Sequence, residues 1–289
     1  MKQNKSIGIF YIVMSAFGFS CMNLFVRLSG DLPSMQKSFF RNLIAFIFAV
    51  GIIIKNHEQV RITKESLLPL IMRSAAGTVG IFCNFYAVDH LPVADASMLN
   101  KLSPFFVLIF SFLILKEKVR WYQWLCIIVA FLGSLFVIKP STDIFQNPAA
   151  IIGALGGLGA GMAYAFVRLS SKKGVKGPVI VAFFSGFSCL ASVPALLINH
   201  TPMAGVQVMY LLLAGLAAAC AQFALTAAYS HAPAREISIF EYSQIIFSTL
   251  LGLIVLHELP DALSFVGYAI IIGASVVMFL CNRKNSVES

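Results

Sequence analysis

The chain has 289 residues, of which 59% are hydrophobic and only 11% are charged. A soluble domain carries about 25% charged residues, so this composition excludes a water-soluble protein and indicates one whose solvent is a lipid bilayer. The net charge of +9 raises the question of a nucleic-acid partner, but the positions of the basic residues, given below, argue against one.

Ten segments are long and apolar enough to be transmembrane helices, which need about 20 such residues each. Pro92 separates the third segment from the fourth, and Pro233 separates the eighth from the ninth, because proline interrupts a helix. The sequence therefore predicts an all-α membrane protein with ten transmembrane helices: Ser6–Leu28, Ser34–Ile54, Leu67–Val88, Ala94–Leu115, Trp121–Ile138, Ala149–Val167, Pro178–Ile198, Val206–Tyr229, Glu236–Leu256 and Ala262–Cys281.

A five-helix unit occurs twice, at an offset of 141 residues. The motif FVRLS at 25–29 recurs at 166–170, and five single residues match at the same offset: His90 and His231, Pro92 and Pro233, Ser97 and Ser238, Leu115 and Leu256, Glu117 and Glu258. An odd number of spans inverts the second unit in the membrane. We predict a 5+5 inverted-topology repeat with units 1–139 and 149–289, joined by a linker at 140–148.

Basic residues set the orientation of such a protein, because cytoplasmic loops are enriched in lysine and arginine. With the N-terminus inside, 16 of the 21 basic residues, Arg73 among them, fall at cytoplasmic ends or loops, and five fall elsewhere: Arg27, Lys37, Arg41, Lys101 and Lys139. We predict a multi-pass protein of the plasma (inner) membrane with both termini in the cytoplasm. Anionic lipid headgroups then explain the positive charge, and no nucleic-acid partner is needed.

The fourth segment carries polar groups where a membrane helix is usually apolar. Asn100 and Lys101 lie about two turns inside it, and Pro104 removes the hydrogen bond to the carbonyl of Asn100. Such a freed carbonyl needs water, a neighbouring group or a ligand. The segment is therefore a candidate solute site, and a plain proline kink is the alternative.

The ninth segment has a matching polar face made by Glu241, Tyr242 and Gln244. At the 141 offset Glu241 falls on Asn100 and Tyr242 on Lys101. Pseudo-symmetric helices that face one cavity would show this pattern. An interhelical hydrogen-bond seam, or a Lys101–Glu241 ion pair that only holds the bundle together, is the alternative.

Glu241 is the candidate for ion coupling, since a carboxylate is easier to protonate in a low-dielectric cavity than in water. Arg41 and Lys101 are candidates to hold an anionic group, so the charges favour a zwitterionic or mixed-charge solute. Asn84 and Tyr164 are further candidates to line the cavity.

Two features have structural interpretations. Gly153, Gly157 and Gly161 stand four residues apart, which is typical of close helix packing, with a sliding or hinge surface as the alternative. Glu117 and Glu258 follow the fourth and ninth segments, where an acidic side chain is expected to cap the next helix.

Motifs of other function classes are absent. The chain has no phosphate-binding GxxxxGK[ST] and no GxSxG or HExxH. Its six cysteines lie in apolar runs without metal-ligand spacing. We therefore expect no enzyme activity, no cofactor and no metal site.

With these residues in view, the chain resembles the ten-helix EamA family of the drug/metabolite transporter superfamily. The resemblance rests on FFRNLIAF in the second segment, NFYAVDHLPVADASMLNKLSPFFVLIFSFLILKEK across the third and fourth, and ISIFEYSQIIFSTLLGLIVLHELP in the ninth. It implies a central cavity enclosed by the first, third, fourth, sixth, eighth and ninth helices. The second helix, with Arg41, is then less central.

We therefore predict a monomeric secondary active or facilitative transporter that moves a small polar metabolite, such as an amino acid or an S-adenosylmethionine-like solute, by alternating access. Protons are candidate coupling ions. Export of cationic drugs is the alternative, although the first segment lacks an acidic residue. A lipid scramblase or a membrane enzyme is a third alternative.

Overall fold

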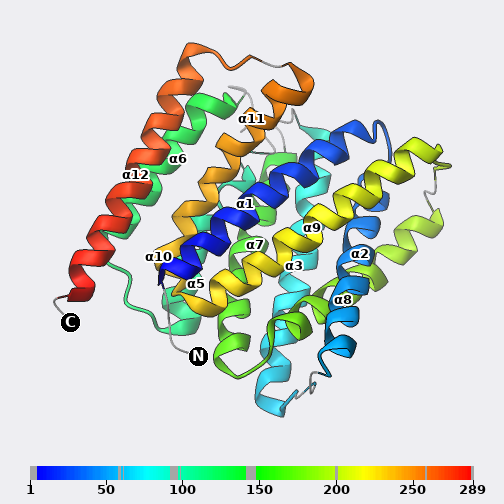
Figure 1. Ribbon diagram of the computed structural model, residues 1–289, viewed down its shortest axis with the longest axis horizontal. Coiled ribbons are helices and arrows are strands. Elements are labelled where there is room, and N and C mark those ends of the chain that lie inside the picture. The colour runs from blue at the N-terminus through cyan, green and yellow to red at the C-terminus, as the bar shows by residue number, and fades with distance from the viewer. Residues whose placement is uncertain are drawn as a thin grey trace.

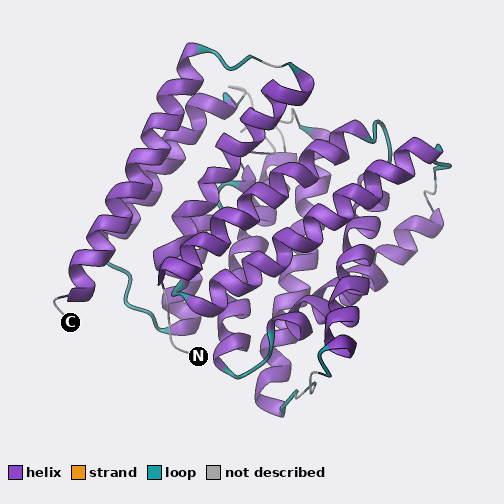
Figure 2. Ribbon diagram, in the orientation of Figure 1, coloured by secondary structure: helices purple, strands orange, loops and turns teal. Residues whose placement is uncertain are grey.

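The computed structural model describes residues 5–57, 60, 62–91, 97, 99–140, 148–198, 201–257 and 259–287, and this part of the chain is helical without a strand (Figure 2). Pro92, Asp95, Glu258 and most of the 140–148 linker lie outside it. The helices are α1 (Lys5–Leu28), α2 (Ser34–Lys55), α3 (Lys64–His90), α5 (Ser103–Leu115), α6 (Trp121–Ile138), α7 (Ala149–Lys172), α8 (Gly177–Ile198), α9 (Gly205–His231), α10 (Ala234–Ile237), the 3₁₀ helix η2 (Ser238–Tyr242), α11 (Ser243–Leu256) and α12 (Ala262–Val287).

Within the described residues, nine segments are long and apolar enough to cross a membrane, and α5 is a tenth, shorter apolar helix. This confirms the predicted all-α protein with ten membrane helices. Two of the predicted segments are not continuous α-helices. The fourth has a turn at residues 101–102 before α5 begins, and the ninth divides into α10, η2 and α11.

The two breaks have different local causes. Pro104 lies in the first turn of α5, where its missing amide hydrogen costs nothing, so the proline starts a helix rather than kinking one. The stretch Ser238–Tyr242 contains no proline or glycine and still forms a 3₁₀ helix. A 3₁₀ stretch within a longer helix often marks a hinge.

The helices pack in pairs between the two halves of the chain. α1 packs along α9 and α3 along α7, while α2 packs along α8 and α6 along α12. Figure 1 shows the α6–α12 pair at one edge of the bundle, beside α11 and away from α2 and α8. α7 also packs against α5, and α1 also packs against α11. Both broken segments therefore lie against the group formed by α1, α3, α7 and α9.

Equivalent elements of the two halves keep the 141-residue offset. α3 and α9 are each 27 residues long, from Lys64–His90 and Gly205–His231. Lys116 and His257 end α5 and α11 in the same left-handed conformation, with φ of 53° and 55°. These correspondences are what a repeat would produce, and the five-plus-five inverted repeat remains our proposal.

The glycine stripe of α7 is a close-packing face. A Cβ atom at Gly157 would lie 2.7 Å from the carbonyl oxygen of Leu99, and one at Gly161 would lie 2.9 Å from that of Ser103. The glycines thus let the backbone of the broken fourth segment approach α7 directly, which confirms the packing interpretation.

Candidate functional site

Both broken segments place their breaks inside the membrane. α5 has 13 residues and α11 has 14, so each is only about 20 Å long at 1.5 Å per residue. The hydrocarbon core is about 30 Å thick. The residues just before α5 and α11, which include Asn100, Lys101 and Glu241, therefore lie at membrane depth.

A small cavity lies between these breaks and the helices around them. Its volume is about 30 Å³, and its lining comes from both halves of the chain: Ile12, Ser15, Ala16 and Phe19 of α1, then Asn100, Lys101, Tyr164, Leu225, Glu241 and Gln244. One water molecule needs about 10–15 Å³ by this measure. The cavity therefore has room for roughly two waters beside its polar side chains.

Two side-chain pairs hold the polar centre together. The Lys101 ammonium donates a hydrogen bond of 2.7 Å to Gln244 Oε1, across 143 residues of sequence. Asn100 Nδ2 donates one of 2.8 Å to Asn84 Oδ1. The structure thus pairs Asn84 with Asn100 and Lys101 with Gln244, and Asn84, unlike the other three, is not among the residues that line the cavity. The Lys101 partner that it shows is Gln244 rather than Glu241.

Glu241 has a partner that sequence reasoning did not assign. The Tyr229 hydroxyl donates a short hydrogen bond to Glu241 Oε1. Tyr229 is completely buried, and its ring stacks on that of Tyr164, with the centroids 5.3 Å apart. A tyrosine near a helix end is usually an interfacial anchor, which is why its role was missed.

Tyr242 is placed differently from the other predicted site residues. It is fully buried in a hydrophobic cluster with residues of α6 and α12, such as Ile127 and Met278. Its hydroxyl donates a hydrogen bond of 3.0 Å to the backbone carbonyl of Lys101. Tyr242 therefore holds the backbone of Lys101 in place, and it is not among the residues that line the cavity.

Two arginines lie beside this centre. The Arg41 guanidinium lies 5.7 Å from the centroid of the Phe19 ring, and Phe19 lines the cavity. The Arg73 guanidinium lies 3.9 Å from the centroid of the Phe184 ring, and Arg73 is 2% exposed. Arg73 lies nine residues inside α3 and is buried there.

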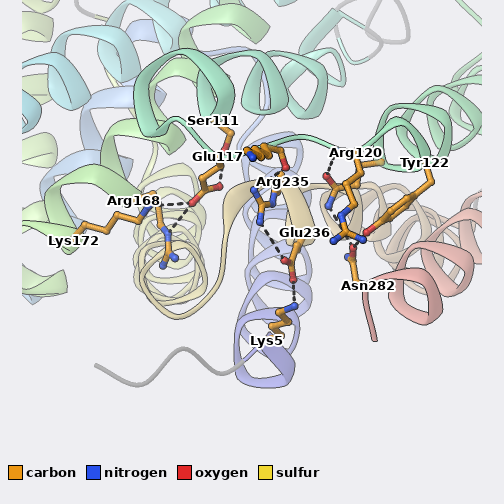
Figure 3. Close-up of polar contacts among 12 residues, drawn as sticks. Lys5, Ser111, Glu117, Arg120, Tyr122, Arg168, Lys172, Arg235, Glu236 and Asn282 are labelled. Carbon is orange, nitrogen blue, oxygen red and sulfur yellow. Dashed lines mark hydrogen bonds and ion pairs between the residues drawn. The ribbon is translucent and has the colours of Figure 1, made fainter. Parts of the chain in front are cut away.

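Ion pairs join the two halves at the end of the bundle that carries both termini (Figure 3). Glu117 contacts Lys172 at 3.2 Å and Arg168 at 3.8 Å, and Ser111 donates a hydrogen bond to it. The predicted capping role of Glu117 is wrong, since its carboxylate binds these side chains instead of the amides of α6. Arg168 in turn donates to the carbonyl of Tyr229, which connects the ion pairs to the cavity.

A second ionic contact at the same end links α1 to α10. Lys5 lies 3.0 Å from Glu236, which is almost fully buried, and Arg235 lies 4.0 Å from the same carboxylate. Arg235 also donates to the backbone carbonyl of Lys118. These contacts hold α1 and α10, and the segment before α6, together at this end of the bundle.

The chemistry of the centre is that of binding. Among the residues that the structure describes, no three His, Cys, Asp or Glu side chains gather in a way that could hold a metal ion. The cavity instead presents one carboxylate, one ammonium, amides and hydroxyls within an apolar wall. This combination suits a polar solute that must be held and released.

The fold and this buried polar centre define a membrane transporter. The chain belongs to the EamA-like transporter family, whose model matches residues 6–139 and again residues 151–280. It is therefore a transporter rather than an enzyme, and an integral multi-pass membrane protein.

Characterised relatives span nearly the whole chain. The pseudopaline exporter of Pseudomonas aeruginosa is 32% identical over 275 residues, which cover 94% of this chain and 95% of that protein. The S-adenosylmethionine uptake transporter of Rickettsia bellii is 24% identical and covers 96% and 95%. A solved structure titled only as a crystal structure of a protein matches with a TM-score of 0.84 at 16% identity, covering 99% of this chain and all of that one. That match shows the shared fold.

Proposed function

We propose that the protein moves a small polar metabolite of mixed charge across the plasma (inner) membrane, by alternating access of its two halves to the cavity around Glu241 and Lys101. The observation that carries the proposal is the composition of that cavity. Its polar lining comes from both halves, and it includes a partly buried carboxylate and a partly buried ammonium 140 residues apart in sequence. Ionisable residues at this depth are costly and are usually functional.

The closed geometry supports alternating access. The cavity of about 30 Å³ is too small for a metabolite, so the halves have to separate before a solute enters. The ion pairs of Glu117 and Glu236 cross between the halves at one end, and the Lys139–Asp261 ion pair crosses between them at the other. The Lys139–Asp261 pair is exposed to water, whereas Glu117 and Glu236 are buried; breaking the contacts at one end while those at the other end persist would let each end open in turn.

Glu241 is proposed to couple transport to protons. Its carboxylate accepts a hydrogen bond from Tyr229, and no described lysine or arginine lies within ion-pair distance of it. Protonation would weaken its hold on a cationic group of the solute and release that group. A cationic drug is a poorer match for the cavity, because Lys101 stands beside Glu241 in the same lining.

Transport in proteoliposomes tests the proposal. Purified protein is first screened for thermal stabilisation by amino acids, nucleosides, S-adenosylmethionine and quaternary cations, and the stabilising solute is then used for uptake with and without a pH gradient. We expect Asn100→Ala to weaken binding and Glu241→Gln to remove the response to the gradient while binding persists. Gradient-driven uptake that is unchanged in Glu241→Gln would show that this residue does not couple protons.

The relatives favour export as the direction. The identity of 32% is with a protein named as an exporter, against 24% with one named for uptake. In proteoliposomes of known orientation, export predicts faster movement of the solute from the face that carries the termini to the opposite face under an inward proton gradient. Equal rates from both faces under the same gradient would contradict this direction.

A further inference from the structure

Arg73 is a buried cation that needs an explanation. It lies nine residues inside α3 and is 2% exposed. A guanidinium cannot lose its proton in a protein, so it stays charged at this depth. A charge that is removed from water is costly unless an opposite charge or several hydrogen bonds compensate for it.

The described part of the chain supplies no such compensation. No carboxylate lies within ion-pair distance of Arg73 or Arg41, and no side chain or carbonyl hydrogen-bonds to either guanidinium there. Arg73 Nε is buried without a hydrogen-bond partner. The contacts of the two guanidinium groups are with the faces of aromatic rings, Phe184 for Arg73 and Phe19 for Arg41. Such contacts position a cation but leave its N–H donors available.

The chain makes room for the Arg73 side chain in this position. A Cβ atom at Gly77, one turn further along α3, would collide with Arg73 Nη1 and would lie 2.8 Å from Phe184 Cε2. Glycine is unfavourable in the middle of a helix. Its presence here permits the guanidinium to lie between α3 and the Phe184 ring of α8.

Tyr164 and Phe19 connect the two arginines to the transport cavity. Both guanidinium groups lie within electrostatic reach of each other and of the Tyr164 hydroxyl. Tyr164 and Phe19 both line the cavity. Lys101 and Glu241 line the cavity itself, while Arg41 contacts Phe19 of the lining and Arg73 lies near Tyr164 of the lining, so three cationic side chains lie in or near it against the one carboxylate of its described lining.

We propose that Arg41 and Arg73, near the Tyr164 hydroxyl, form the anion-binding part of the transport site, and that the transported solute is an organic anion carrying at least two negative groups. The inference rests on the proposed function and specifies its substrate class. Arginine binds carboxylates and phosphates with two parallel hydrogen bonds, and two such groups on one solute balance the excess positive charge of the site.

Paired ligands that differ by one charge test the proposal. Binding to purified protein is measured by calorimetric titration with succinate against succinamate, L-glutamate against L-glutamine, and glycerol 3-phosphate against glycerol. We expect at least one dianion or diacid to bind at least tenfold more tightly than its less charged counterpart. A wild-type protein that binds every pair equally, or binds none of these anions, overturns the proposal.

Substitutions identify the residues that cause the preference for the more negatively charged ligand. Arg41→Gln and Arg73→Gln are each expected to reduce it at least tenfold. Arg73→Lys keeps the charge and is expected to retain part of it, which separates loss of the cation from loss of folding. Gly77→Ala keeps the arginine but displaces its guanidinium, and should also weaken the preference. Arg27→Gln, at an exposed position of α1, is the matched control and should leave it unchanged.

The two proposals fail in different ways. A preference for the diacid that survives in both Arg41→Gln and Arg73→Gln overturns the anion site. Binding of a neutral or cationic solute that depends on Asn100 and Glu241, without any preference for an added negative group, also overturns the anion site but leaves the transporter proposal intact. Diacid binding that requires the arginines, with no transport in proteoliposomes, instead contradicts the proposed function.

Discussion

The Tyr242 hydroxyl donates a hydrogen bond of 3.0 Å to the backbone carbonyl of Lys101, and the two residues are 141 positions apart. That separation is the offset of the proposed repeat, so equivalent positions of the two units touch each other beside the cavity. Contact between equivalent positions is expected only near an axis that relates two halves. The hydrogen bond thus joins the backbone at the break before α5 to a side chain at the break before α11.

Tyr242→Phe is expected to lower the free energy of unfolding by about 1 kcal/mol, which is typical for the loss of one intramolecular hydrogen bond. The change should also loosen Lys101 and reduce solute affinity. Thermal melting in detergent measures the first effect. Tyr268→Phe is the control, because the buried Tyr268 hydroxyl has no partner among the described residues and its removal should not destabilise the protein. Equal losses in both variants would contradict a supporting role for Tyr242.

Gly157→Ala is expected to destabilise the protein by about 1–3 kcal/mol, the usual range for overpacking. The new methyl group would lie 2.7 Å from the backbone carbonyl oxygen of Leu99, and backbone cannot move aside as a side chain can. Gly273→Ala in α12 is the matched control, since nothing lies within 4 Å of its added Cβ. That change should leave stability equal or raise it by up to about 1 kcal/mol through helix propensity. Melting temperatures that fall equally in both variants would show that crowding is not the cause.

Glu117→Gln is expected to destabilise the closed state by about 3 kcal/mol, because it leaves a buried arginine without its counter-charge. Glu117 is 9% exposed and Arg168 is 2% exposed. Since Arg168 also contacts the carbonyl of Tyr229, the change should make the cavity more accessible from the end that carries the termini. Hydrogen exchange of α7 and α9 amides measures both effects. Unchanged exchange there would mean that these ion pairs do not hold the bundle closed.

Asp261 gives a stability contribution that depends on pH. Hydrogen bonds from Lys139, and from the hydroxyl and amide of Ser264, lower the pKa of its carboxyl from 3.8 to about 2. A folded-state pKa below the unfolded value means that the contribution is full above about pH 4 and is lost as the pH falls toward 2. Melting curves of wild type and Asp261→Asn should therefore differ above pH 4 and converge below it. A difference that does not narrow with acid would contradict the assignment.

Much of the fold was readable from the sequence because the bilayer imposes a simple requirement. Apolar length alone located the ten helices, and the 141 offset pointed to Asn100, Lys101, Glu241 and Gln244 as one polar centre. The break at Ser238–Tyr242 was not predicted, since no proline or glycine marks it. A 3₁₀ turn there depends on packing that a single sequence does not reveal.

The arginine site shows a different limit of sequence reasoning. Arg73 lies near the expected cytoplasmic end of its segment, and a long basic side chain in that position usually extends to the interface. Only its neighbours in space, Phe184 and Gly77, show that it turns inward. A glycine one turn after a basic residue within an apolar helix is the weak signal that the sequence did contain.

The small cavity also bears on how the protein could be inhibited. Under the proposed alternating access, a cavity of about 30 Å³ would have to expand around the solute and close again, so a bulkier compound with the same charges would bind in the open state and prevent closure. The size of a compound, rather than its charge, would then decide whether the protein transports it or is inhibited by it.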